Sequence, residues 1–202
     1  MEGFAGIIGA AERLDQNITL AINSLHSPPT DALWVLFSDK RVWYLMYFAL
    51  AVLLFVRLGW KKALITLFGV ALTVAACDQG ANLVKDGVAR LRPVWDNYMV
   101  SHGLHRLEGR GNFYGFFSAH AANSLGVATL VVKVFRSGDK SRNYRSLAAV
   151  MYFWAASVGI SRVFVGKHFL GDVLAGFAAG LLIGLVFAGI IRRIFHKYSL
   201  YL

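Results

Sequence analysis

Residues Ser161 to Ile191 read SRVFVGKHFLGDVLAGFAAGLLIGLVFAGII, and this stretch decides the fold class. From Phe169 to Ile191 the only charged residue is Asp172, so the segment is long and apolar enough to cross a hydrocarbon core of roughly 30 Å as a helix. Arg162, Lys167 and His168 stand directly before it. Charge at the border of a membrane span is costly, and it indicates a functional site.

The composition extends this interpretation to the whole chain. Of its 202 residues 57% are hydrophobic, which leaves too little polar surface for a soluble domain. In lipid the backbone must satisfy its own hydrogen bonds, so the apolar stretches are expected to be helices. We predict an all-α, polytopic membrane bundle forming one domain over residues 1–202, with a catalytic core at 60–190. About five spans are expected: Val42–Val56, Ala63–Val84, Phe117–Phe135, Tyr144–Ile160 and Phe169–Ile191.

Residues 1–39 have a different pattern. Apolar residues recur there at helical spacing, while polar residues such as Glu12 and Asp15 interrupt any span. This pattern predicts an amphipathic helix lying at the membrane interface, which Pro28 and Pro29 then end. Its apolar positions are Phe4, Ile7, Ile8, Ala11, Leu14, Ile18, Ala21 and Ile22.

The net charge of +10 is concentrated in three regions, one around Lys61, one around Lys140 and one around Arg192. In a five-helix arrangement all three fall on the same side, and the positive-inside rule makes that side cytoplasmic. We therefore expect a bacterial inner-membrane protein whose other face is periplasmic, rather than a nucleic-acid-binding protein.

On the predicted outer side, the stretch from Lys85 to Pro93 reads KDGVARLRP. Lys85 offers a compact charge and Arg92 a planar fork, and together they suit the oxygens of a tetrahedral anion. Taken alone, basic residues here are also typical of interfacial anchors.

A second group is Ser118 and His120, at the start of an apolar segment. Ser118 is a candidate N-cap, which leaves backbone N–H groups at a helix start suited to phosphate. His120 in the first turn is a candidate general acid, although a lone histidine is more often structural.

The third group is Arg162, His168 and Asp172. With the fifth span starting at His168, Asp172 lies one helical turn further on and is placed to orient the imidazole for nucleophilic attack. Arg162 is placed to balance charge on a phosphoryl group. The alternative for Asp172 is a carboxylate that only favours the helix N-terminus.

The order and spacing of these groups resemble the type 2 phosphatidic acid phosphatase (PAP2), or lipid phosphate phosphatase, superfamily. Its first motif is a lysine, six residues and Arg-Pro, matched by Lys85, Arg92 and Pro93. Its third motif is matched by Ser161, Arg162, His168 and Asp172. The middle motif, Pro-Ser-Gly-His, keeps Ser118 and His120 but has Phe117 for proline and Ala119 for glycine.

The resemblance implies hydrolysis of a phosphomonoester or diphosphate without metal or other cofactor. It assigns nucleophilic attack to His168, orientation of His168 to Asp172 and general-acid catalysis to His120. It assigns phosphate binding to Lys85, Arg92, Ser118 and Arg162. The substrate is expected to be a cell-envelope lipid, with lipid A or undecaprenyl diphosphate favoured over phosphatidylglycerophosphate and phosphatidic acid.

Rival interpretations are a transporter of anions or lipids, an inactive lipid-binding relative that reflects the changes at Phe117 and Ala119, and a vanadium haloperoxidase. The apolar spans argue against the last. The roles of four other polar residues are left open. Asp78 and Asn82 either support the site or pair with Lys85. His102 and His105 are accompanied by no cysteine and no suitably spaced carboxylate, so no metal site is expected there. The oligomeric state is not predicted.

Overall fold

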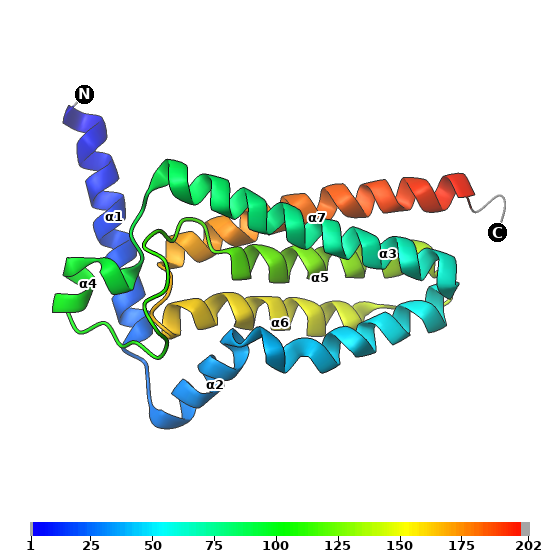
Figure 1. Ribbon diagram of the computed structural model, residues 1–202, viewed down its shortest axis with the longest axis horizontal. Coiled ribbons are helices and arrows are strands. Elements are labelled where there is room, and N and C mark those ends of the chain that lie inside the picture. Colours follow the sequence, from blue (N-terminus) through cyan, green and yellow to red (C-terminus); the bar gives the residue numbers. More distant parts are fainter. Residues whose placement is uncertain (1, 199–202) are drawn as a thin grey trace.

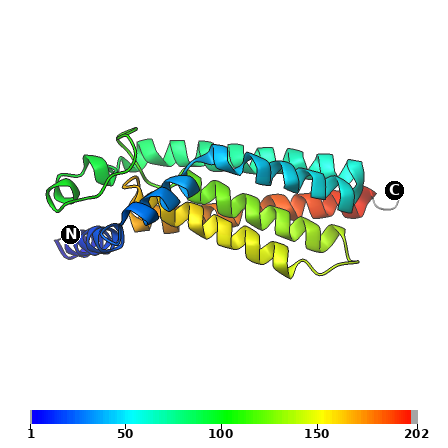
Figure 2. The same ribbon diagram turned by 90° about the horizontal axis from the view of Figure 1, so that it is seen from below.

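In the computed structural model, four long helices run parallel or antiparallel along one axis, and one of them is bent back on itself (Figures 1 and 2). They are α3 (Tyr44–Val88), α5 (Ala119–Gly138), α6 (Arg145–Phe164) and α7 (Leu170–Tyr198). The structure describes residues 2–198, with side chains from residue 6 onward. Met1, residues 199–202 and the Phe4 side chain lie outside this part.

Helix α3 contains two of the predicted spans, Val42–Val56 and Ala63–Val84. It reverses direction at Gly59, whose φ of 75° and ψ of 163° are accessible mainly to glycine. Figure 1 shows the two arms, residues 44–58 and 60–88, running in opposite directions. Within the described residues the bundle therefore has five long helical arms, which equals the number of spans predicted from the sequence.

Helix α5 lies at the centre of the bundle, between α3, α6 and α7. Along α7, Gly176, Gly180 and Gly184 face the backbone carbonyls of Ser118, Ala122 and Gly126 in or next to α5. A Cβ at any of these glycines would overlap α5, so the four-residue glycine repeat serves packing within the bundle.

Among the described residues, three stretches are long and apolar enough to cross a membrane: Lys40–Val88, Arg145–Phe164 and Leu170–Tyr198. Helix α5, the third predicted span, does not meet this criterion. The polar residues His120, Asn123 and Ser124 near its start and the basic residues Lys133 and Arg136 near its end lower its mean hydropathy. The all-α membrane bundle is confirmed, and the chain is a multi-pass membrane protein.

Helix α6 corrects one predicted boundary. The expected span ended at Ile160, with His168 starting the next helix. In the structure α6 continues to Phe164, so Arg162 is helical, and α7 begins at Leu170. His168 therefore lies in the turn between the two helices.

Helix α1 (Glu2–Asn23) crosses one end of the bundle nearly at right angles, and α2 (Pro28–Ser38) leads from it through a short 3-10 helix (Lys40–Trp43) into α3 (Figures 1 and 2). The buried side chains of α1 are polar, Gln16, Thr19 and Asn23, whereas Ile7 and Leu14 are more than 60% exposed. The amphipathic helix is thus present, with its apolar face turned away from the protein.

The two ends of the bundle differ in composition. One end holds α1, a short 3-10 helix (Pro93–Trp95), α4 (Asn97–Ser101) and the turn after α6. The other end holds the bend of α3, the α5–α6 connection and the end of α7, where the three basic regions lie. The predicted separation of the basic loops from the candidate site is present.

Candidate active site

The three sequence groups meet at the α1 end of the bundle. Lys85, Arg92, His120, Arg162 and His168 all line a single cavity of about 670 Å³. These are five of the seven residues predicted from the sequence, and they come from α3, the loop after it, α5, α6 and the α6–α7 turn. Segments far apart in the chain therefore share one polar chamber.

His168 is held by the carboxylate of Asp172. The His168 Nδ1 atom lies 3.3 Å from Asp172 Oδ2, and the same oxygen accepts a hydrogen bond from the Phe169 backbone N–H at 3.1 Å. Nδ1 is thus occupied, and Nε2 is the nitrogen that faces Arg92 Nη1, at 3.4 Å. Burial lowers the pKa of His168 to about 4, although Asp172 opposes this shift, so the ring is neutral at pH 7.

Sequence reasoning missed Arg90, which stabilises Asp172 from the other side. Arg90 donates to Asp172 Oδ1 at 2.8 Å and to Asp15 Oδ2 at 2.7 Å, and its guanidinium lies 4.1 Å from the centre of the Phe169 ring. Burial disfavours the charge on Arg90, but the two carboxylates outweigh burial and raise its pKa. The available signal was a further arginine inside the KDGVARLRP stretch.

Gly115 was also missed, and it lies against the same pair. A Cβ on Gly115 would come within 3.1 Å of Asp172 Oδ2 and 3.5 Å of His168 Nδ1. Only a residue without a side chain leaves this contact undisturbed. Its backbone N–H donates to Arg90 O at 2.9 Å, which ties the loop before α5 to the loop after α3.

Arg92 is fixed by the same pairing of loops. Its backbone N–H donates to Phe113 O at 2.8 Å, and its Nε donates to Tyr114 O at 3.1 Å. Burial first, and then the charge of Arg162, lower the pKa of Arg92. A bound anion would relieve both effects, which is the electrostatic signature of an anion-binding site.

Arg162 is 5% exposed and its charge is balanced by Glu108. Arg162 Nη1 lies 3.3 Å from Glu108 Oε1 and also donates to Ser38 Oγ, at the end of α2. The guanidinium Nε of Arg162 has no hydrogen-bond partner among the described residues. Glu108 and Ser38 could not be found from the sequence, because they lie 54 and 124 residues away.

Lys167 adds a further cation to the cavity wall. Its Nζ donates to Gly109 O and lies 4.0 Å from Glu108 Oε2. Burial lowers the pKa of Lys167, Glu108 opposes this shift, and Arg162 and Arg92 lower it further. The polar chamber therefore carries an excess of positive charge.

Ser118 is the N-cap of α5, as predicted, and its hydroxyl accepts from the Ala121 N–H at 3.4 Å. It is fully buried and does not line the cavity, which corrects the expectation of direct phosphate contact. Its N–H donates to the Asp172 carbonyl at 3.0 Å. Ser118 thus joins the starts of α5 and α7, while Ala119 and His120 face the cavity.

The departures from the expected middle motif fit their surroundings. Ala119 is the first residue of α5, a position that needs no glycine. Phe117 is buried in an apolar cluster with Cys77, Ala81 and Ala122. Neither change removes His120 from the chamber.

Three of the polar residues whose roles were left open have defined places. Asp78 lines the cavity and accepts from Asn123 Nδ2 at 2.8 Å, so it supports the chamber through α5. His102 is exposed, with its Nδ1 beside Tyr98 O. His105 belongs to a separate group with His26 and Asp31.

Comparison with known proteins agrees with this geometry. The family model for the PAP2 superfamily matches residues 42–196. A lipid A 4'-phosphatase of Bacteroides thetaiotaomicron is 32% identical over 169 residues, covering 83% of this chain and 72% of the relative. A lipid A 4'-phosphatase of Porphyromonas gingivalis is 30% identical over 172 residues, covering 85% and 70%.

Two solved structures share the fold. A PAP2-type phosphatidylglycerolphosphate phosphatase from Bacillus subtilis has a TM-score of 0.70 at 21% identity, covering 92% of this chain and 88% of that one. LpxE from Aquifex aeolicus has a TM-score of 0.61 at 19% identity, covering 85% and 92%. The predicted family and the predicted class of lipid phosphatase are confirmed, whereas the single domain and the individual roles stay predictions. This chain belongs to the PAP2 superfamily.

Proposed function

We propose that this membrane lipid phosphatase removes a phosphate group from lipid A, through a phosphohistidine intermediate on His168. The observation that carries the proposal is the cavity itself. One end is the cationic chamber, and the same cavity continues along an apolar wall between α3, α5 and α6. The wall consists of Trp43, Tyr47, Leu50, Leu54, Leu67, Val70, Val74, Val127, Val131, Trp154 and Val158.

A cavity of this kind fits an amphiphile with a phosphate head. The phosphate would lie among Lys85, Arg92 and Arg162, where its charge offsets cations that burial destabilises. The apolar wall would receive acyl chain carbons. A water-soluble phosphate ester would leave that wall unused.

The first chemical step forms a bond between His168 Nε2 and phosphorus while the bond from phosphorus to the lipid oxygen breaks. Asp172 holds Nδ1 and stabilises the positive charge that develops on the imidazole. His120 gives a proton to the departing lipid oxygen. Lys85, Arg92 and Arg162 stabilise the oxygens of the transferring group.

In the second step the oxygen of a water molecule bonds to phosphorus while the bond from phosphorus to His168 Nε2 breaks, and the water passes its proton to His120. Inorganic phosphate then leaves, and both imidazoles return to their starting states. No step needs a metal ion, and the donors around the phosphate are cations and imidazoles rather than carboxylates. Ser118 contributes indirectly, by capping the start of α5, where Ala119 and His120 line the cavity.

The lipid A preference rests on the two relatives of at least 30% identity, whose names give that activity. Undecaprenyl diphosphate, phosphatidylglycerophosphate and phosphatidic acid are the competing substrates. We also propose that the chain lies in a bacterial inner membrane with this chamber on the periplasmic side, since the basic loops lie at the opposite end.

The test is phosphate release by purified protein in detergent, with lipid A and the three competing lipids, in the presence and absence of EDTA. We expect release from lipid A that survives EDTA and is lost in His168→Ala. His102→Ala is the matched control, because it removes an exposed imidazole at the same end of the molecule. Faster release from another lipid would overturn the substrate proposal, and full activity of His168→Ala would overturn the mechanism.

A further inference from the structure

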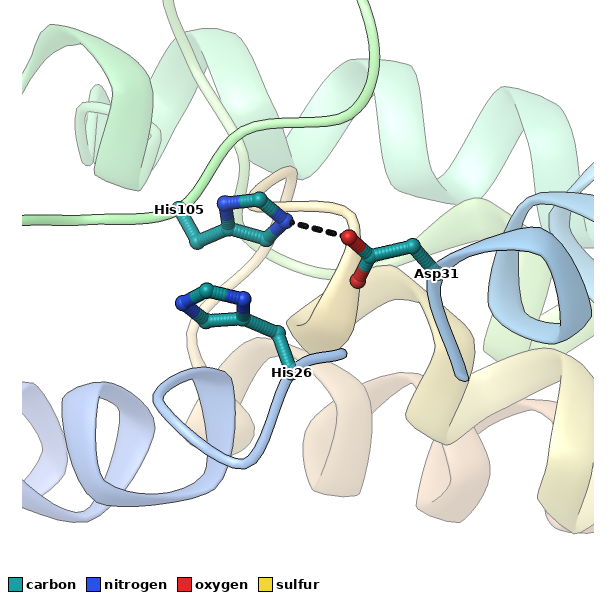
Figure 3. A group of neighbouring side chains, drawn as sticks. All are labelled: His26, Asp31 and His105. Carbon is teal, nitrogen blue, oxygen red and sulfur yellow. Dashed lines mark hydrogen bonds and ion pairs between the residues drawn. The ribbon is translucent and has the colours of Figure 1, made fainter. Parts of the chain in front are cut away.

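Three metal-ligating side chains gather at the α1 end, outside the phosphate chamber. His26 lies between α1 and α2, Asp31 lies in the first turn of α2, and His105 lies in the loop that follows α4 (Figure 3). One ligand atom from each residue lies within 4.8 Å of the other two. Asp31 and His105 are 74 residues apart, so the sequence could not show this group.

The group has the donor types and the spacing that a zinc ion requires. Two imidazoles and one carboxylate, with water as the fourth ligand, are a common Zn²⁺ set. Ligands at about 2.0–2.2 Å from a tetrahedral ion are roughly 3.4 Å from one another. His105 Nε2 already lies 2.9 Å from Asp31 Oδ2. The rings of His26 and His105 are stacked and nearly parallel at 3.8 Å, so the His26 ring must turn before nitrogens of both rings can point at one ion.

Two members of this group have polar atoms without a hydrogen-bond partner among the described residues, which points to a bound ligand. Asp31 Oδ1 is buried without a hydrogen-bond partner, and among the described residues the His26 ring makes no hydrogen bond. A simple His105–Asp31 pair would need neither His26 nor the second carboxylate oxygen. An ion bound beside both imidazoles uses one nitrogen of His26, and its water can donate to Asp31 Oδ1.

The backbone at His105 is fixed before any ion arrives. The Asn23 side chain accepts from the His105 N–H at 2.8 Å and donates to the His105 carbonyl at 3.0 Å. A ligand held by such contacts loses little entropy on binding. The site thus needs adjustment mainly at His26, which is exposed.

We propose that His26, Asp31 and His105 bind a divalent transition-metal ion of the Zn²⁺ type. The ion has a structural role. It ties the α1–α2 joint to the loop that carries Glu108, the partner of Arg162 in the cavity wall. It takes no part in phosphoryl transfer, so this proposal stands or falls separately from the proposed function.

The experiment uses full-length protein without a histidine tag, stripped with chelator and titrated with Zn²⁺ by calorimetry. We expect about one ion per chain and a higher thermal unfolding temperature in zinc. His26→Ala and His105→Ala should each weaken binding by about tenfold or more and abolish the thermal shift. His102→Ala, which removes a neighbouring imidazole, should bind as the wild type does.

Co²⁺ substitution gives a second readout, because tetrahedral cobalt with imidazole ligands absorbs visible light strongly, unlike octahedral hydrated cobalt. His26→Ala guards against a folding defect, since the His26 side chain is exposed and, among the described residues, its ring makes a stacking contact with His105 and no hydrogen bond. Absence of stoichiometric zinc binding, binding unaffected by both His26→Ala and His105→Ala, or an octahedral cobalt spectrum would overturn the proposal.

Discussion

At the scale of single residues, charged side chains beside the chamber stabilise one another through a series of contacts. Arg90 donates hydrogen bonds to the carboxylates of Asp15 and Asp172, and Asp172 contacts Nδ1 of His168. Only the last of these links is visible in the spacing of the sequence. The first link comes from α1, so Asp15 helps to hold His168 in place through Arg90 and Asp172.

The pH dependence of the reaction should reflect the lowered pKa of His168. With a pKa of about 4, His168 stays neutral and nucleophilic as the pH falls from 7 toward 5, whereas a histidine of ordinary pKa, about 6.5, would be mostly protonated. We expect kcat/KM to fall on the acid side of its pH profile only well below pH 6.5. This holds after the profile is corrected for the second ionisation of the substrate phosphate, near pH 6. Asp172 raises this pKa, so Asp172→Asn should move the limb to still lower pH while slowing the reaction. A wild-type limb centred near 6.5 would contradict the assignment.

Arg90 is predicted to be a positioning residue. Arg90→Gln leaves the buried carboxylate of Asp172 without its charged partner, so His168 is oriented less well, and kcat should fall by about 10- to 100-fold. KM should change little, because Arg90 does not line the cavity. Arg90→Lys should recover part of the activity. A rise in KM at constant kcat would instead place Arg90 in substrate binding.

At the scale of elements, the close contact of α7 with α5 aligns the two halves of the site. His120 lies in the first turn of α5 and Asp172 in the first turn of α7. The glycine repeat of α7 allows the backbones of the two helices to touch. Any change that separates the two helices therefore acts on both stability and catalysis.

Two glycines of α7 provide a matched test. A methyl group at Gly180 would overlap the Ala122 backbone, so Gly180→Ala should destabilise the protein by about 1–3 kcal/mol and lower its thermal unfolding temperature in detergent. A methyl group at Gly189 would have no neighbouring atom within 4 Å, so Gly189→Ala should be neutral or slightly stabilising. Equal effects of the two substitutions would show that the α5–α7 contact is not what requires Gly180.

At the scale of the whole molecule, the sequence predicted what depends on local patterns. Apolar length predicted the long helical arms of the bundle, and the fixed spacing of Arg162, His168 and Asp172 predicted the candidate catalytic group. The contributions of Glu108, Ser38 and Asp15 were not predictable, since each joins the site across a long separation in the chain. The end of α6 was misplaced because the predicted span stopped before the polar pair Ser161 and Arg162, whereas in the structure both residues are buried in a helix that continues to Phe164.

Transmembrane orientation can be tested by labelling single cysteines introduced at the two ends of the bundle. Cys77 is buried, and Cys77→Ser provides a background for new cysteines. A membrane-impermeant maleimide should label Ser101→Cys, near the site, in intact spheroplasts. It should label Ser141→Cys, in the basic loop, only after lysis. The reverse pattern would place the chamber on the cytoplasmic side.

The contact of α1 with the start of α7 also bears on how the protein is made. Thr19 accepts a hydrogen bond from Leu170 N and Asp15 accepts one from Gly171 N, at 3.0 Å and 2.9 Å. The two partners in these contacts are separated by 151 and 156 residues, so α1 is synthesised long before the segment that it contacts. The support that Asp15 gives to Arg90, and through it to Asp172, can therefore form only after the start of α7 has been synthesised.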